Sequence, residues 1–138
     1  MTAWNSETSA LQARVRDYRA QAPTTAVLDD CQRELSRYAE DVRPRLTRMQ
    51  AMSRGMDECM SAMGRLSEAD LAATCAAMDA ELERYANEGC RSVDAARNRA
   101  DAEAHCDQML EYLDRSTMRS QSMSWMMGSG MMAGGICR

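Results

Sequence analysis

Sulfur-bearing side chains are the most abundant reactive groups in this chain of 138 residues, which contains six cysteines and 14 methionines. Neighbouring cysteines are at least 15 residues apart in the sequence. Because no CxxC or CxxxC pair occurs, zinc-ribbon and thioredoxin-type sites have no support. An even number of widely spaced cysteines is typical of disulfides formed in an oxidising compartment. The cysteines are Cys31, Cys59, Cys75, Cys90, Cys106 and Cys137.

Methionines are concentrated in a helical stripe from Met49 to Met63 and in the Gly- and Ser-rich segment 123–138. Thioethers and thiolates are soft ligands, so the sequence predicts a binding site for Cu(I) or Ag(I). The terminal segment resembles the Met-rich segments of extracytoplasmic copper-handling proteins, and this resemblance implies copper binding. The candidate ligands are Met56, Met60, Met78, Met123, Met126, Met127, Met131 and Met132.

A second interpretation of the methionines needs no metal. Thioethers fill irregular gaps in helical cores, so the stripe is equally typical of a Met-filled interior. The terminal segment would then pack on the bundle, contact a membrane surface or mediate association with a second copy or another protein.

Other kinds of active site find little support in the sequence. His105 is the only histidine, so a catalytic zinc site with two or three histidines is excluded. Position 102 is alanine, and the Glu-x-x-His motif of di-iron bundles is therefore missing. No nucleophilic triad and no phosphate-binding loop is recognisable. We therefore expect a non-enzymatic protein, with His105 on a solvated helix surface.

The charge of the chain argues against nucleic-acid binding. The formal net charge is −4, and all 17 basic residues are arginine. Because nucleic-acid binding depends on neutralising phosphates, a mildly acidic chain is a poor candidate for it. Acidic residues lie at helical spacing from the basic run at 43–54, so we expect an ion-paired, solvated surface there.

Apolar residues recur every three or four positions along most of the chain, which predicts helices. One stripe covers residues 5–21 and ends before Pro23. A second runs from Leu28 to Leu66, where Pro44 should kink or break the helix. A third runs from Leu71 to Leu113, after a tight turn at 64–67. The low Gly and Pro content excludes β-sandwiches and barrels.

Two long stripes joined by a tight turn predict an antiparallel hairpin, in which the numbers of facing residues add to a constant. The residue numbers of Cys59 and Cys75 add to 134, as do those of several pairs of apolar residues. Those of Cys31 and Cys106 add to 137, which corresponds to a slip of a few residues produced by a kink at Pro44. The sequence therefore predicts the disulfides Cys59–Cys75 and Cys31–Cys106. Cys90 and Cys137 would pair with each other or link two chains.

The predicted fold is all-α: a disulfide-stapled, long antiparallel helical hairpin with a packed N-terminal helix, in total a three- to four-helix bundle. Residues 1–122 would form the bundle domain and residues 123–138 a flexible Met/Gly-rich tail. No stretch is apolar enough for a transmembrane segment. Met1–Ala22 has no apolar signal core, so we expect a mature periplasmic or secreted segment with an added start methionine.

The function that we expect is soft-metal binding outside the cytoplasm. The alternative is a metal-free, disulfide-stapled structural or protein-interaction module.

Overall fold

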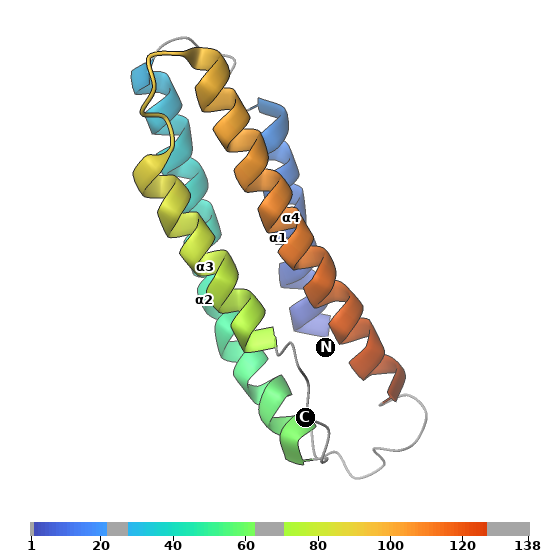
Figure 1. Cartoon of the computed structure of the whole chain (residues 1–138). Helices are drawn as coiled ribbons and strands as arrows, with labels where there is room; N and C mark the ends of the chain where they lie inside the picture. Colours follow the sequence, from blue (N-terminus) through green and yellow to red (C-terminus); the bar gives the residue numbers. More distant parts are fainter. Residues whose placement is uncertain (1, 22–27, 63–70, 127–138) are drawn as a thin grey trace.

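The structure is a bundle of four helices that run alternately up and down (Figure 1). The computed structural model describes residues 2–21, 28–62 and 71–126, with side chains at 3–21, 28–56 and 71–118. Each helix packs against its neighbours around the bundle, α1 against α2 and α4, and α3 against α2 and α4. The predicted all-α fold is confirmed. The helices are α1 (Thr2–Gln21), α2 (Leu28–Ala62), α3 (Leu71–Glu88) and α4 (Ala95–Met126).

The apolar stripes of the sequence form the core of the bundle. Trp4, Leu11, Val15 and Tyr18 of α1 are all buried, as their spacing predicts. Pro44 lies on the exposed face of α2, which continues as one helix through it. At that position the missing N–H leaves only a solvent-facing carbonyl without its partner, so the helix tolerates the proline.

The chain reverses direction after α3, at Gly89 and Cys90, where the sequence predicted either one continuous arm or a break near Gly89. The Gly89 amide donates to the Tyr85 carbonyl oxygen at 2.6 Å. A Cβ on Gly89 would lie 2.7 Å from the Tyr85 ring, so only glycine fits here. Cys90 then adopts a φ of 54°, a left-handed conformation that stops the helix.

Polar side chains of the turn begin α4 in the new direction. Asp94 caps the helix, because its carboxylate accepts a hydrogen bond from the Ala96 amide at 3.0 Å. The Asn98 side chain accepts from the Ser92 amide and donates to the Ser92 carbonyl, at 3.1 and 2.8 Å. This loop makes α4 parallel to α2.

The reversal overturns one predicted disulfide. Cys31 is bonded to Cys90, and their Cα atoms are 5.7 Å apart, whereas Cys106 is a buried free thiol. The prediction Cys31–Cys106 was wrong because the rule for facing residues holds only within an antiparallel pair, and Cys106 lies on a helix parallel to α2. Val93, within the predicted third stripe, lies in the loop between α3 and α4 and is 96% exposed.

Toward the α3–α4 turn, the register between α2 and α3 also differs from the predicted one. The residue numbers of observed partners add to 121 for Cys31 and Cys90, and to 126 for Arg43 and Glu83, against the predicted 134 to 137. The predicted turn at 64–67 and the Cys59 side chain lie outside the described residues. The pair Cys59–Cys75 therefore stays a prediction.

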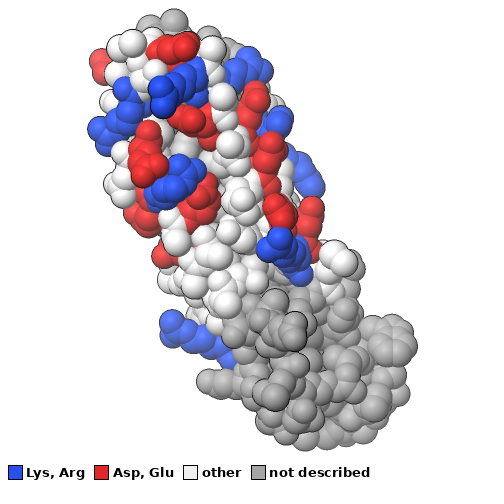
Figure 2. Space-filling view, in the orientation of Figure 1, with Lys and Arg blue, Asp and Glu red and all other residues white. Residues whose placement is uncertain are grey.

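Ion pairs between helices cover the charged surface, where blue and red side chains alternate in Figure 2. The expected pairing of the basic run at 43–54 is confirmed for three arginines. Arg43 contacts Glu83 of α3 at 2.7 Å, while Arg45 and Arg48 both contact Glu7 of α1. Most of these side chains are partly solvated, so each pair contributes little to the free energy of unfolding.

We predict that replacing Cys31 and Cys90 together by alanine lowers the free energy of unfolding by roughly 4 kcal/mol. The disulfide closes a sequence separation of 59 residues, and long closed loops restrict the unfolded chain strongly. Denaturant unfolding measures the effect, and Cys106→Ala is the control with a smaller expected loss. Peptide mapping without reduction must find Cys31 linked to Cys90, and a Cys31–Cys106 peptide would contradict the structure.

Candidate functional site

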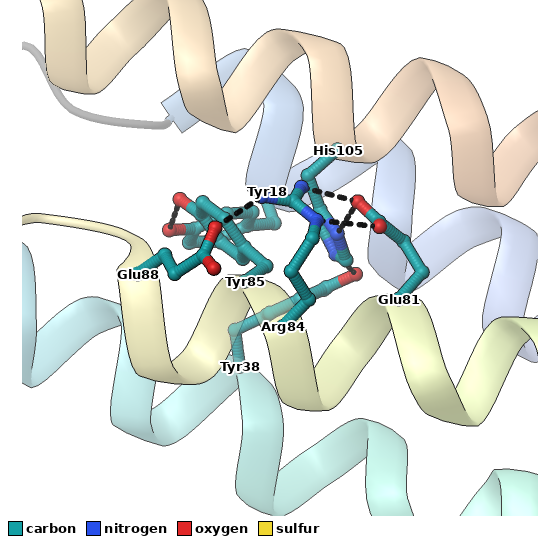
Figure 3. Close-up of polar contacts among 7 residues, drawn as sticks. All are labelled: Tyr18, Tyr38, Glu81, Arg84, Tyr85, Glu88 and His105. Carbon is teal, nitrogen blue, oxygen red and sulfur yellow. Dashed lines mark hydrogen bonds and ion pairs between the residues drawn. The ribbon is translucent and has the colours of Figure 1, made fainter.

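Each of the four helices contributes one polar aromatic side chain to the interior, and together these form the most unusual feature of the bundle (Figure 3). Tyr18 comes from α1, Tyr38 from α2, Tyr85 from α3 and His105 from α4. All four are at most 4% exposed. We call these four residues the tyrosine–histidine layer.

The imidazole of His105 is bonded at both ring nitrogens. Its Nδ1 lies 3.2 Å from Oε1 of Glu81, and its Nε2 lies 2.9 Å from the Tyr38 hydroxyl. Because an ionised carboxylate can only accept, Nδ1 carries the hydrogen. Nε2 is then the acceptor, and the Tyr38 hydroxyl donates to it. The contacts therefore fix one neutral tautomer of His105.

The remaining contacts in the layer join the tyrosines. The Tyr18 and Tyr85 hydroxyls lie 2.8 Å apart and share a hydrogen bond. The Tyr18 ring stacks on Tyr38 with centroids 4.2 Å apart, and the Tyr85 ring stacks on His105 at 4.3 Å. Every polar tip in the layer thus has a partner, which burial in a helical core requires.

An ion-pair network on α3 extends from the layer toward the surface. Arg84 donates two hydrogen bonds to Glu81, at 2.6 and 2.8 Å, and a third to Glu88 at 3.1 Å. The pKa of Glu81 is lowered, mainly by the hydrogen bonds from Arg84 and despite its partial burial. Glu81 is therefore ionised at neutral pH and can accept from His105.

Burial governs the protonation of the other groups here. Desolvation lowers the pKa of His105 to about 4, although Glu81 favours the charged form. It raises the pKa of Tyr18 to about 12 and that of Tyr85 further. The pKa of the Cys106 thiol is raised to about 12 as well. At neutral pH the four residues of the tyrosine–histidine layer and the Cys106 thiol are therefore uncharged. The protonated Cys106 thiol is a poor nucleophile and metal ligand.

The expectation that His105 lies on a solvated surface was wrong, since its side chain is completely buried. Ala96, Ala100 and Ala104 lie at helical spacing within the predicted third stripe, but all three are exposed. The buried residues that follow each other at helical spacing are Ala102, His105, Met109 and Leu113. That spacing was present in the sequence and could have identified the histidine as a core residue.

Of the predicted metal ligands, the structure describes the side chains of Met56 and Met78. Met78 is buried in α3 and Met56 is half-buried in α2. The side chains of Met60, Met123, Met126, Met127, Met131 and Met132 lie outside the described residues.

The described methionines divide into two classes by burial. Met49, Met78 and Met109 are fully buried and pack in the apolar core. Met52 and Met56, one turn apart on α2, are only partly buried, and Met118 of α4 is 68% exposed. A soft ion could reach the second class without unpacking the core.

A shallow groove lies between α2 and α3 on the described surface. Its volume is about 370 Å³, and it lies beside the disulfide. Polar and small side chains line it, including Gln32, Ser36, Asn87 and Arg91. The groove holds no cluster of reactive groups.

Comparisons with protein-family models, with curated proteins and with solved structures found no match. Among residues 3–21, 28–56 and 71–118, no three His, Cys, Asp or Glu side chains lie close enough to hold a metal ion together. None of the described helices combines the length and the apolar character that crossing a membrane requires.

We predict that Tyr38→Phe lowers the free energy of unfolding at pH 7 by about 1–2 kcal/mol, because it leaves the buried Nε2 of His105 without a donor. Tyr112→Phe is the matched control, since Tyr112 is partly solvated and its ring contacts Arg115 at the surface. Chemical denaturation of both variants compares them. Equal losses would show that the Tyr38–His105 bond adds nothing.

Proposed function

We propose that this chain is a non-enzymatic, extracytoplasmic helical protein that binds a soft metal ion, Cu(I) or Ag(I), through methionine thioethers. One observation carries the proposal: partly accessible methionines gather at one end of the bundle. Met52 and Met56 lie toward the end of α2, and Met118 lies toward the end of α4. These two helix ends are at the same end of the molecule (Figure 1).

Helical periodicity extends this arrangement along α2. Met52, Met56 and Met60 follow each other at intervals of four residues, which places them along one side of the helix. Soft thioether sulfur suits Cu(I) and Ag(I), whereas hard ions prefer oxygen. We therefore assign the ligands to this side of α2 and to the methionines of the last segment, Met123, Met126, Met127, Met131 and Met132. We leave Met78 out of the set because it is fully buried in the core.

The disulfide supports the proposed compartment. Cys31 and Cys90 are oxidised in the folded bundle, and such bonds persist mainly outside the reducing cytosol. Thioethers also suit an oxidising location, because they bind without losing a proton and are not consumed by disulfide formation.

The metal-free structural or protein-interaction module is the second candidate. This candidate is favoured by the complete burial of Met49, Met78 and Met109, because their side chains fill the apolar core. The groove between α2 and α3 and the exposed Met118 would then be the surfaces offered to another protein or to a second copy.

We predict that the full chain competes with a chromophoric Cu(I) chelator under anaerobic conditions, at pH 7.5 and also at pH 6. Thioethers need no deprotonation, so the apparent affinity should change little between the two pH values. Replacing Met52, Met56 and Met60 by leucine should reduce the bound copper, and removing residues 127–138 should reduce it further.

The matched control replaces the buried residues Met49, Met78 and Met109 by leucine. This triple variant should bind as much copper as the unmodified chain, because its thioethers are in the core. If the unmodified chain does not compete with the chelator, soft-metal binding is wrong and the interaction module takes its place.

A further inference from the structure

We propose that the tyrosine–histidine layer is an acid-sensitive latch: a proton added to His105 separates α1 and α4 from the pair α2–α3. This role does not depend on the proposed metal binding. It rests on the position of the one histidine of the chain, at the point where all four helices meet.

The first step is the loss of the Tyr38 bond. At neutral pH the Nε2 lone pair of His105 accepts the Tyr38 hydrogen at 2.9 Å. A second proton on the imidazole occupies that lone pair, so both groups then present a hydrogen to each other. Among the described side chains, His105 is the one acceptor that the Tyr38 hydroxyl reaches. Protonation therefore leaves a buried hydroxyl without an acceptor, which is costly.

The second step concerns the new charge. Among the residues that the structure describes, Glu81 is the only carboxylate in contact with the imidazole. Both oxygens of Glu81 already accept hydrogen bonds from Arg84. The cation of Arg84 also disfavours a positive His105. The other titratable or charged groups near the layer are Tyr18 and Arg14 from α1, Tyr38 and Glu34 from α2, Tyr85 and Glu88 from α3, and Cys106 from α4. Glu88 is bonded to Arg84, and Glu34 acts on Tyr18.

The third step sets the line along which the bundle opens. The disulfide Cys31–Cys90 and the ion pair Arg43–Glu83 hold α2 and α3 together on either side of the layer. By contrast, no disulfide joins the described parts of α1 and α4 to that pair. In the layer they meet it through side-chain hydrogen bonds and ring stacking. Between α1 and α2 there are also partly solvated ion pairs, Arg14–Asp41 and those of Glu7 with Arg45 and Arg48, which contribute little. The charged imidazole can regain water when α4 moves away, while the cross-linked pair stays folded.

The direction of the pH effect follows from the two states. His105 has a pKa of about 4 in the closed bundle and about 6.5 when it is exposed. The open state therefore binds more protons, and closure weakens as the pH falls from 6.5 toward 4. Between pH 7 and pH 5 the equilibrium should shift toward the open state by about 20-fold. The pKa values of Glu7, Glu81 and Glu83 are lowered from 4.5, so these carboxyl groups titrate below this range.

The Cys106 thiol is completely buried in the closed bundle and follows His105 directly in the sequence. Its reaction with a thiol reagent therefore reports the opening of the bundle. The full chain is treated with 4,4′-dithiodipyridine at pH 7 and pH 5, and labelling of Cys106 is followed by peptide mass mapping. Each rate is divided by the rate for the urea-unfolded chain at the same pH. The latch predicts that this ratio rises about 20-fold at pH 5, while the Cys31–Cys90 peptide stays intact.

His105→Gln is the variant that tests the role of the proton, because its amide can donate to Glu81 and accept from Tyr38 but does not titrate. Its labelling ratio should be the same at both pH values. His105→Phe, which keeps the stacking on Tyr85, replaces it if the glutamine variant does not fold. A rise at pH 5 in the non-titrating variant would overturn the proposal. A His105 imidazole that titrates near pH 6.5 by NMR, with Cys106 still protected, would also overturn it.

Discussion

The two hydrogen bonds of one buried imidazole impose the strictest constraint on this bundle. His105 must place Nδ1 against Glu81 of α3 and Nε2 against Tyr38 of α2, so its position fixes three helices relative to one another. Apolar contacts alone would tolerate small shifts of one helix along another. A shift that breaks a hydrogen bond of the buried imidazole leaves a ring nitrogen unsatisfied, which costs free energy of folding. Stacking with Tyr85 and the Tyr18–Tyr85 hydrogen bond include α1 in the same layer.

The two ends of the bundle are built differently around this layer. Toward the α3–α4 turn, the disulfide Cys31–Cys90 and the hydrogen bonds of the loop define one geometry. Toward the other end, the buried residues Met49, Met78 and Met109 pack among leucines, and their flexible thioethers adapt to the space that remains. A precise polar layer and an adaptable thioether core together allow a chain with few large aliphatic residues to form a bundle.

The sequence predicted the helices well because burial in a bundle follows directly from spacing. The stripe residues Leu35, Tyr38, Val42 and Leu46 are all buried. The direction of the last helix could not be derived from spacing, since it depends on the left-handed Cys90 and on the contact between Gly89 and Tyr85. A disulfide inferred from facing positions failed for that reason.

The candidate site was predictable only in part. Tyr18, Tyr38 and Tyr85 appeared in the expected stripes, but their hydroxyls needed partners that a stripe does not reveal. Their arrangement depends on His105, which is held as the neutral Nδ1–H tautomer between Glu81 and Tyr38. The most direct test is the ¹⁵N NMR shift of both ring nitrogens at pH 7. We predict a protonated Nδ1 and an unprotonated Nε2, and a protonated Nε2 would contradict this account.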